Sequence, residues 1–562
     1  MDLKQVLAEY LKDFFHGMLT EEKIYNLIEI PKNPEHGDLA FPCFQLAKLL
    51  KKSPVEIATE LSEELGKSNH FSKVNQIGPY LNVFFSSKEI GMKVITEVLK
   101  EGHTFGKGAT GENKTVVLDM SSPNIARPFS MGHLRSTVIG NALANLADKC
   151  GYKTVKINHL GDWGTQFGKL ITAYKKWGDE EKVKVNPIQE LSKLYVKFHE
   201  EAEINNNLEA EARAAFKCLE DGDKENLQLW KWFRDESLKA FMRIYDLLGV
   251  SFDSYKGEAF YNDKMEEVVD LLKEQNLLEI SDGAEVVKLD NSQLPPCLIK
   301  KSDGATLYAT RDLAAAIYRQ KSYQFDTALY VVGQEQTVHF KQVKGVLEKL
   351  DFRWADGMHH IPFGLYLKDG KRMSTRKGRV ILLEEVLREA IQHAEMNITD
   401  KNPSLMNAGK VAESVGVGAI IFHDLKNDRM NNIEFSLKDM LTFEGETGPY
   451  VQYTHARAMS ILEKAKIDEY EFQGLKDQES WEIIKHLNHF PEIIENAYKL
   501  FSPSVLAKYL IHLSQSFNKY YAKVRIIEKD EQLLSRLSLV KAVTIVLKEG
   551  LRILGVKAPN EM

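Results

Sequence analysis

The first hundred residues carry both helical and strand patterns. Apolar positions recur at helical spacing over residues 3–11 and 46–65, and Pro54 directly after Ser53 is typical of a helix start. Residues 80–85 (YLNVFF) are typical of a strand. A polar, glycine-containing stretch over residues 102–113 then indicates a linker. We therefore expect a small α+β domain over residues 1–112.

A different pattern begins at residue 115. The short apolar run 115–120 (TVVLDM) is typical of a buried parallel strand. A polar loop, a helical stretch over residues 134–150 and a second strand over 154–158 follow, which is the order of a βαβ unit in a doubly wound sheet. The strand–helix alternation resumes at 306–332, after a charged helical stretch at 188–248. The pattern predicts a Rossmann-like α/β domain over residues 113–381 with a helical insertion at about 180–255.

The remainder of the chain is almost entirely helical in pattern. Helical periodicity is clearest over residues 384–395, 480–489, 491–500 and 505–524. We expect a helical connector over residues 382–435 and an all-α domain over 436–562. The predicted fold class is therefore multidomain α/β, with an α+β domain before the doubly wound sheet and an all-α domain after it.

Composition limits the class of protein. A chain of 562 residues exceeds a single core, since cores stop growing near ~250–300 residues. The net charge of −6 neither requires nor excludes nucleic-acid binding, which depends on local basic surface. The four cysteines form no C-x-x-C pair, which argues against a zinc site or a disulfide framework. We find neither a signal peptide nor an apolar run of about 20 residues, and expect a soluble, cytoplasmic monomer without membrane or DNA partners.

The most informative stretch is 121–136 (SSPNIARPFSMGHLRS), which lies between the first strand of the βαβ unit and its helix. A helix start at this place directs N–H groups and a positive dipole end toward phosphate. Gly132 leaves room for a nucleotide, and His133 can donate to phosphate oxygens as charge develops. Taken alone, these residues are equally compatible with a structural Gly-His at a helix start.

The same stretch resembles the HIGH motif of class I aminoacyl-tRNA synthetases, in the version found in arginyl-tRNA synthetases. Further blocks that resemble this family follow in the family's order: residues 158–168 (NHLGDWGTQFG), 308–312 (YATRD), 332–336 (VGQEQ), 370–378 (GKRMSTRKG, resembling the KMSKS signature) and 446–457 (ETGPYVQYTHAR). Residues 36–40 (HGDLA) and the terminal Ala558-Pro559 add to the resemblance, which covers nearly the whole chain.

Two positions depart from the family pattern. Ser130 replaces the first histidine of HIGH, and the second signature lacks its usual second lysine, while Arg127 precedes HIGH where such enzymes usually carry a lysine. The resemblance implies catalytic roles for residues of both signatures: His133, Ser130, Arg127, Arg372, Met373 and Ser374. It implies ATP contacts from Gly132, His133, Gly161, Asp162, Arg376 and Lys377.

Recognition of arginine can be argued chemically. A guanidinium is planar and always charged, and it pairs best with carboxylates. Tyr308 and Asp312 are four residues apart in a helical stretch and so face one side. A single acid is usually a solvated surface charge, and the resemblance is what implies an arginine pocket here. Its implied members are Ser122, Asn124, Glu258, Tyr308, Asp312 and Gln336.

Contacts with tRNA are implied at both ends of the chain. An aromatic ring beside an amide suits a splayed RNA base, and aromatics interleaved with cations suit a single strand. The implied residues are Tyr80 and Asn82 near the N-terminus and Tyr453, Arg457, Tyr520 and Arg525 near the C-terminus, with some of these aromatics expected in the helical core.

The resemblance implies ATP-dependent attachment of arginine to its tRNA through an arginyl-adenylate, with activation waiting for bound tRNA. Mg²⁺ is expected to arrive with ATP rather than in a protein site of its own. Two alternatives stay open at this point. One is another HIGH-type enzyme, either a synthetase for a different amino acid or a small-molecule nucleotidylyltransferase. The other is a tRNA-binding paralogue without catalysis, which the loss of the first HIGH histidine would suit.

Overall fold

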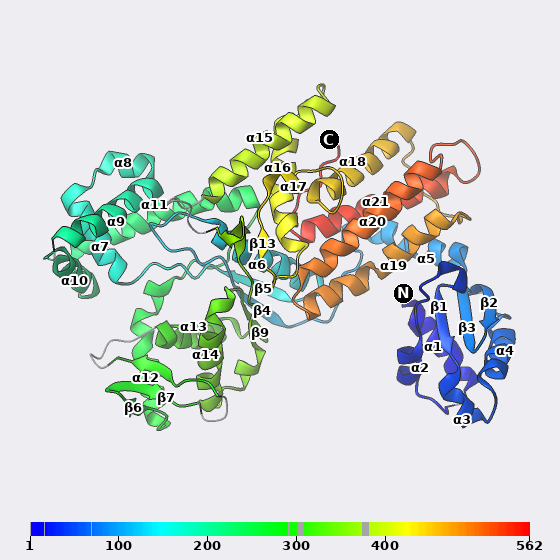
Figure 1. The fold of residues 1–562 in the computed structure, drawn as a ribbon, viewed down its shortest axis with the longest axis horizontal. Helices are drawn as coiled ribbons and strands as arrows, with labels where there is room; N and C mark the ends of the chain where they lie inside the picture. Colours follow the sequence, from blue (N-terminus) through cyan, green and yellow to red (C-terminus); the bar gives the residue numbers. More distant parts are fainter. Residues whose placement is uncertain are drawn as a thin grey trace.

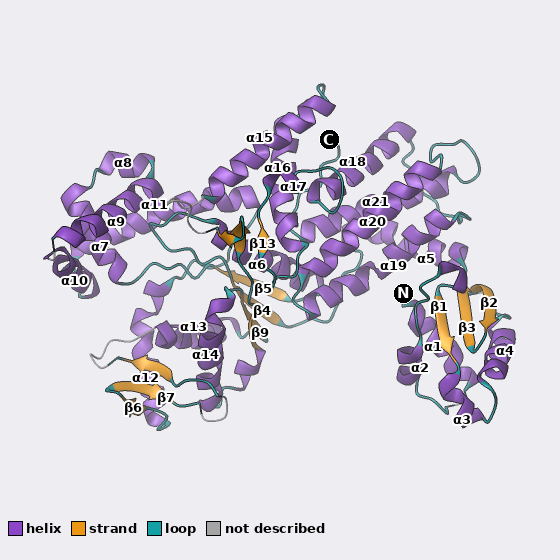
Figure 2. Cartoon of the chain, viewed as in Figure 1, coloured by secondary structure: helices purple, strands orange, loops and turns teal. Residues whose placement is uncertain are grey.

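A computed structural model describes residues 2–15, 17–68, 70–205, 207–289, 293–301, 308–373 and 382–562. The molecule is elongated, with the N-terminal domain at one end and a bundle of insertion helices at the other (Figure 1). The parallel sheet lies between them, and the C-terminal helices pack beside it. Helices dominate (Figure 2), and no helix in the described ranges is long and apolar enough to cross a membrane.

The N-terminal domain is an antiparallel sheet in the order β1-β3-β2, covered by helices. Ser53 and Glu56 form a capping box at the start of α4, since each side chain accepts a hydrogen bond from the other's backbone N–H. Lys51, at φ +52°, divides the helical pattern of residues 46–65 into two helices. The elements are α1 (Leu3–Phe14), α2 (Glu21–Leu27), β1 (Leu39–Pro42), α3 (Ala47–Leu50), α4 (Pro54–Leu65), β2 (Phe71–Ile77), β3 (Tyr80–Phe85) and α5 (Ser87–Glu101).

The central domain has a four-stranded parallel sheet in the order β10-β9-β4-β5, with α6 as the crossover from β4 to β5. This confirms the predicted βαβ unit. Its elements are β4 (Thr115–Asp119), α6 (Met131–Lys149), β5 (Lys153–Ile157), α13 (Tyr308–Tyr323), β9 (Thr327–Tyr330), α14 (Thr337–Lys349) and β10 (Met358–His360).

Helices also form the insertion: α7 (Thr165–Trp177), α8 (Glu180–Val185), α9 (Pro187–Ile204), α10 (Asn207–Glu220) and α11 (Lys224–Leu248). The sequence pattern did not predict the small antiparallel sheet that follows α12 (Met265–Glu274). Its strands are β6 (Glu279–Ser281), β7 (Ala284–Val287) and β8 (Cys297–Lys300). These strands are too short for period-2 alternation to stand out.

Two predictions for the C-terminal half are wrong in detail. The helices expected at 480–489 and 491–500 are one helix, α19, with Pro491 inside it. Packing of α19 against α20, α5, α21 and α6 outweighs the cost of an internal proline, about 3 kcal/mol. A short strand, β13, lies in the region expected to be wholly helical. The helices are α15 (Leu383–Lys401), α16 (Ala408–Leu425), α17 (Leu437–Met440), α18 (Gly448–Ala465), α19 (Gln478–Lys499), α20 (Pro503–Lys523) and α21 (Leu533–Ile553).

The strand β13 (Ile433–Glu434) completes a small sheet with β11 (Tyr366–Lys368) and β12 (Lys371–Arg372). Strands β11 and β12 form an antiparallel hairpin, and β11 pairs in parallel with β13. This hairpin leads directly into the second signature segment.

Asp38 joins the N-terminal domain to α19. Its carboxylate accepts hydrogen bonds from Trp481 Nε1 at 2.9 Å and from the Phe85 N–H at 3.0 Å, and Lys485 Nζ lies 3.4 Å away. This contact gives the 36–40 block a structural role.

Candidate active site

A cavity of about 430 Å³ opens above the carboxyl ends of β4 and β9. Four segments form its walls: the loop after β4, the first turn of α6, the loop after β9 and the β11–β12 hairpin. The structure thus brings together eight residues singled out from the sequence: Ser122, Asn124, Ser130, Gly132, His133, Gln336, Arg372 and Met373. Ligand sites in open α/β sheets lie at this edge.

The first turn of α6 holds His133 in one orientation. The Ser130 N–H donates to His133 Nδ1 at 3.1 Å, and Ser130 Oγ lies 3.2 Å from the same nitrogen. Burial lowers the pKa of His133 to about 4, so the ring is neutral at physiological pH. Because Nδ1 accepts a hydrogen bond, the proton resides on Nε2. His133 is therefore a neutral donor.

Two glycines shape the cavity in different ways. A Cβ added at Gly132 would meet nothing nearer than Ser130 Oγ at 3.6 Å, so the protein's own packing does not require glycine there. The missing side chain instead leaves room for a ligand. A Cβ at Gly161 would lie 1.9 Å from Asn124 Oδ1, so glycine is required to seat Asn124. Gly161 was predicted to contact ATP, whereas the structure gives it the role of making room for the Asn124 side chain.

The loop after β4 is strained. Ser121, Ser122 and Ala126 have φ values of +72°, +49° and +58°, which non-glycine residues rarely adopt. Helix α11 supports this loop, because Tyr245 Oη lies 2.7 Å from Ser121 Oγ and Ser237 Oγ accepts from the Ala126 N–H at 3.1 Å. Neither α11 residue was singled out from the sequence.

The predicted arginine-binding acids Glu258 and Asp312 lie outside the cavity lining. Burial raises the pKa of Glu258 to about 7, and the charge of Asp312 contributes to the rise, while Arg311, with NH1 3.7 Å from Glu258 Oε2, opposes it. Burial also disfavours ionisation of Asp312, but His339 Nε2, 2.6 Å from Asp312 Oδ2, helps to bring its pKa below the ordinary value. Glu258 is thus an acid that can become neutral near physiological pH, and Asp312 is an ionised acid whose charge acts on it.

Other members of the predicted arginine pocket have partners of their own. Tyr308 begins α13 and is 67% exposed, with the Arg311 guanidinium 6.0 Å from its ring. Ser122 Oγ donates to Asp119 Oδ1 at 3.0 Å, and the buried Arg319 pairs with Asp119 at 2.8 Å. His339 and Arg311 were missed as individual residues, although both lie in or next to the quoted sequence blocks.

Two residues predicted to act on ATP have other partners. Asp162 is buried, and its carboxylate accepts from Arg234 Nε and from the Ala259 N–H, both at 2.9 Å. Asp162 thus connects the loop after β5 to α11 and to Ala259. With its carboxylate held in these contacts, the structure does not support the predicted contact between Asp162 and ATP. Arg127 is exposed and lies over the Tyr195 ring at 5.5 Å. The predicted residues Ser374, Arg376 and Lys377 lie outside the described residues.

The predicted RNA contacts divide into exposed and buried residues. Tyr80 packs edge-on against the exposed Phe44, which the sequence analysis missed. Asn82 is only 3% exposed and donates to the His36 carbonyl, so it cannot read a base without local opening. Tyr520 is fully buried in the helical core, and its prediction as an RNA contact is wrong. Tyr520 and Tyr521 are adjacent in α20, and adjacent side chains of a helix point to different faces, so Tyr521 is exposed while Tyr520 is buried.

The remaining C-terminal residues form an accessible cluster. The Arg457 guanidinium lies 4.8 Å from the Tyr453 ring and 5.1 Å from the Tyr521 ring, and it donates to Asn518. Arg525 is exposed nearby in sequence. Among the residues with described positions, no group of three His, Cys, Asp or Glu side chains could hold a metal ion.

Three family models match the chain in sequence order. They are the Arginyl tRNA synthetase N terminal domain over residues 1–85, the catalytic domain of class I tRNA synthetases (R) over 94–437 and the DALR anticodon binding domain over 451–562. The chain is also 60% identical to Arginine--tRNA ligase 2 of Bacillus anthracis and 58% identical to Arginine--tRNA ligase of Enterococcus faecalis, with full coverage of both chains in each case.

The chain belongs to the arginyl-tRNA synthetase family. Solved structures agree on the fold. The Thermus thermophilus arginyl-tRNA synthetase superposes with a TM-score of 0.82 at 24% identity, over the whole of both chains. The Plasmodium falciparum enzyme gives 0.80 at 23% identity, covering all of this chain and 98% of the other. The fold class predicted from the sequence is confirmed, and the alternative of a nucleotidylyltransferase outside the arginyl-tRNA synthetase family is excluded.

Proposed function

We propose that this protein attaches arginine to its cognate tRNA, using ATP and passing through an arginyl-adenylate. The observation that carries the proposal is the arrangement of the site. A nucleotide-sized cavity with a neutral histidine donor lies at the start of α6, and outside its lining the charge of Asp312 acts on a second acid, Glu258. Paired acids suit a guanidinium, and the cavity suits the phosphates and ribose of ATP.

In the first step, the carboxylate of arginine attacks the α-phosphate of ATP, and pyrophosphate leaves. His133 Nε2–H donates to the phosphate as charge develops, and the N–H groups at the start of α6 face the same position. Arg372, which is exposed at the cavity wall, supplies positive charge. Arg127, Arg376 and Lys377 share that role in this proposal, and Mg²⁺ arrives with ATP.

In the second step, the terminal ribose hydroxyl of the tRNA attacks the arginyl carbonyl, and AMP leaves. No side chain forms a covalent intermediate, so catalysis consists of positioning and charge stabilisation. The half-buried Tyr80 with the exposed Phe44, and the stack of Arg457 with Tyr453 and Tyr521, offer rings and cations of the kind that bind single-stranded RNA.

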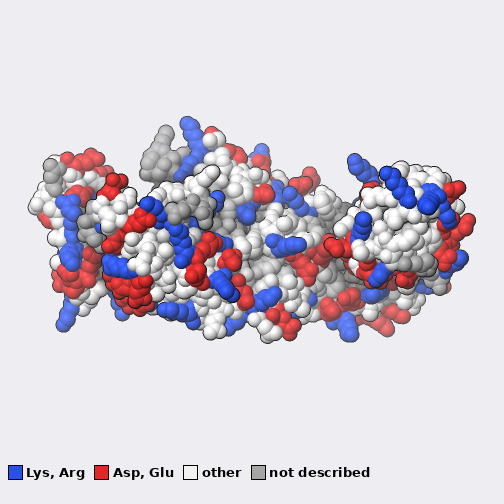
Figure 3. Space-filling model, turned by 90° about the horizontal axis from the view of Figure 1, so that it is seen from below, with Lys and Arg blue, Asp and Glu red and all other residues white. Residues whose placement is uncertain are grey.

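We further propose a cytoplasmic monomer without DNA or membrane partners. On the face drawn in Figure 3, acidic and basic side chains are interspersed rather than gathered into one continuous basic surface. That distribution suits a soluble protein whose RNA contacts are local.

Arginine-dependent ATP–pyrophosphate exchange, measured with and without arginine tRNA, tests the function. We expect exchange near background with arginine and ATP alone and a strong rise when the tRNA is added. Strong exchange without tRNA would refute the proposed tRNA dependence while leaving arginine activation intact. Exchange with another amino acid, or none under any condition, would overturn the function itself and favour a synthetase of different specificity or a non-catalytic paralogue.

A further inference from the structure

Three buried polar side chains meet behind the cavity, each from a different element. Arg135 of α6 places its Nε 3.2 Å from Asp424 Oδ2 of α16, and the two side chains are 1% and 0% exposed. The guanidinium also lies 5.8 Å from the ring of Tyr366, the first residue of β11. Arg135 NH1 donates to the Asn431 carbonyl at 2.8 Å. This cluster therefore connects the first signature helix, the connector helix and the hairpin of the second signature.

Stability alone is a poor explanation for this cluster. Within the described part of the chain, Arg135 Nε, both Asp424 oxygens and the Tyr366 hydroxyl lack a well-aligned hydrogen bond. Burial raises the pKa of Asp424, and Arg135 opposes that rise. A buried ion pair with incomplete hydrogen bonding often contributes less to stability than packed apolar residues would. What the cluster does provide is a fixed spacing of α6, α16 and β11.

The residues of this cluster lie next to the cavity residues of both signature segments. Arg135 lies two residues after His133 in α6, and Tyr366 O accepts from the Met373 N–H at 3.0 Å. Leu367, next to Tyr366, pairs with Arg372 across the hairpin. Arg135 and Tyr366 also line the cavity together with His133, Arg372 and Met373. A shift of β11 against α6 would therefore change the separation of the two signature segments.

We infer that Arg135, Asp424 and Tyr366 are positioning residues that set the distance between His133 and the Arg372–Met373 end of the hairpin. The inference rests on the proposed function, in which both segments act on one ATP. Arginine recognition depends on Glu258 and Asp312, which are not part of this cluster. Loosening the cluster should therefore reduce the rate of adenylate formation and leave arginine binding unchanged.

Asp424→Asn and Tyr366→Phe test this inference, because each keeps the side-chain volume. We expect kcat for arginylation to fall about 10- to 100-fold, the scale of a small misplacement of reacting groups. The KM for arginine should stay within about twofold of the parent value. Rates are measured well below each variant's Tm and expressed per folded protein, as judged by circular dichroism. A lower Tm with unchanged kcat in both variants would overturn the inference.

A double variant separates positioning from folding. The double variant Arg135→Met, Asp424→Leu removes both charges, so no unpaired charge remains buried. Its Tm should therefore be higher than that of a single variant and closer to that of the parent. We expect kcat to remain low, because apolar packing does not restore the directed contact from Arg135 to Asn431 and Asp424. Recovery of kcat together with Tm would show that the pair has a purely structural role.

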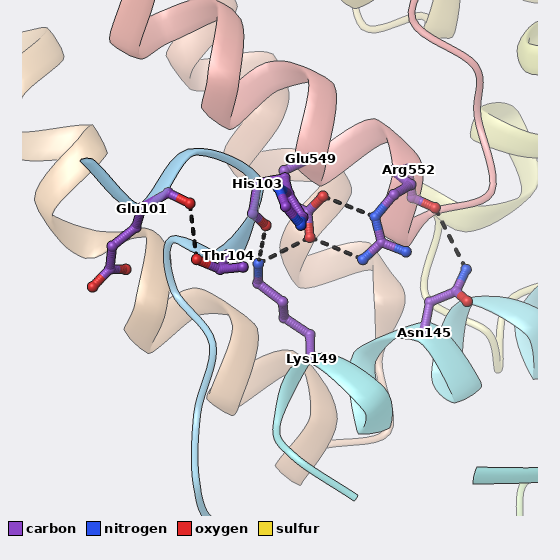
Figure 4. Close-up of polar contacts among 7 residues, drawn as sticks. All are labelled: Glu101, His103, Thr104, Asn145, Lys149, Glu549 and Arg552. Atoms are coloured by element: carbon purple, nitrogen blue, oxygen red, sulfur yellow. Dashed lines mark hydrogen bonds and ion pairs between the residues drawn. The ribbon is translucent and has the colours of Figure 1, made fainter. Parts of the chain in front are cut away.

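The same helix supplies a matched control. At its other end, Lys149 Nζ lies 2.9 Å from Glu549 Oε1, with side chains 4% and 5% exposed (Figure 4). Arg552 also donates to Glu549. Glu549→Gln should lower Tm and leave kcat and both KM values unchanged, because this pair lies away from the cavity. An equal loss of kcat in Glu549→Gln would mean that any loosening of α6 suffices, and the inference would fail. Arginylation by the parent protein tests the proposed function separately.

Discussion

Ser130 and His133 show how one local contact can replace part of a sequence signature. The backbone N–H of Ser130, not its hydroxyl alone, fixes the imidazole through Nδ1. The serine therefore need not provide a charge, since its main task in the structure is to begin α6 and to hold the ring of His133. The second half of the signature contributes the donor.

Substitutions at these two positions should have unequal effects. Ser130→Ala keeps the backbone contact and should cost about 1 kcal/mol, the scale of one neutral hydrogen bond. His133→Ala removes a donor aimed at developing charge, worth ~2.7–4 kcal/mol in comparable sites. Ser130→His should also reduce activity, because close-packed sites resist added volume at ~1–3 kcal/mol. The measurement is kcat/KM for ATP, and equal losses in the two alanine variants would contradict the assignment.

Asp312 is the ionised member of the proposed guanidinium pair. Asp312→Asn keeps the size of the side chain but removes its charge and weakens its hydrogen bond with His339 Nε2. Loss of one partner in a close charge pair typically costs ~2–5 kcal/mol. We expect the KM for arginine to rise strongly while the KM for ATP hardly changes. An unchanged KM for arginine would show that the pocket is placed wrongly.

Glu258 should make arginine binding depend on pH. With its pKa raised to about 7 by burial, Glu258 is mostly protonated at pH 6 and mostly ionised at pH 8. The positive guanidinium pairs with the ionised form, so the KM for arginine should fall as pH rises through 7. Glu258→Gln should remove this dependence and keep the KM high throughout. Asp312→Asn, the matched control, should retain it, and a flat profile in the parent would contradict the proposal.

At the scale of elements, the insertion helices do more than extend the molecule. Helix α11 reaches back to the strained loop after β4 and to the loop after β5. Tyr245 Oη contacts Ser121 Oγ at 2.7 Å and accepts from Asn158 Nδ2 at 2.9 Å. The insertion thus stabilises a backbone conformation that the loop would not adopt alone.

Tyr245→Phe tests this support. The change removes one buried hydroxyl and leaves Asn158 Nδ2 without its partner, which typically costs ~1–3 kcal/mol, while Ser121 Oγ keeps its contact with Thr137 Oγ1. We expect a lower Tm and a reduced kcat/KM for ATP, because the loop carries Ser122 and Asn124 into the cavity. Tyr255→Phe is a suitable control, since its hydroxyl contacts Met242 Sδ and not the loop. Similar kinetics in the two variants would argue against the supporting role of Tyr245.

At the scale of the whole molecule, the proposed function requires the three domains that the family models match to act together on one tRNA. The N-terminal domain meets α19 through Asp38, which is mostly buried and accepts from Trp481 while pairing with Lys485. Asp38 lies in the 36–40 block, outside the two signature segments that form the cavity. Because Asp38 also accepts from the backbone N–H of Phe85 in β3, the contact connects the strand that begins with Tyr80 to α19.

Asp38→Ala should therefore change RNA binding selectively. Hydrogen bonds to a charged group contribute about 1.5–3 kcal/mol, so the domain joint should loosen measurably. We expect the KM for tRNA to rise severalfold in the arginylation assay, with the KM for arginine unchanged. Lys67→Ala, which removes an exposed ion pair within the N-terminal domain, is the control and should have no effect. Equal KM values for tRNA in parent and Asp38→Ala would contradict this role of the joint.

The sequence by itself determined most of the longer elements and their order. Continuous apolar runs identified three of the four parallel strands, β4, β5 and β9. Helical periodicity identified the C-terminal half, and the spaced motif blocks identified the family and most residues of the cavity. These features are local, because a strand, a helix start or a signature segment can be recognised from residues that are close together in the sequence.

Only the tertiary structure decided which polar side chains work on which partner. Asp162 holds Arg234 of an insertion helix, Tyr520 turns into the core, and Arg135 meets Asp424 almost 300 positions later in the chain. Each outcome depends on the packing of elements distant in sequence, and the adjacent positions Tyr520 and Tyr521 of one helix place one ring in the core and the other at the surface. The hydrophobic periodicity of a sequence does not show which distant side chains pair. The cluster of Arg135, Asp424 and Tyr366 could therefore be recognised only in the folded structure.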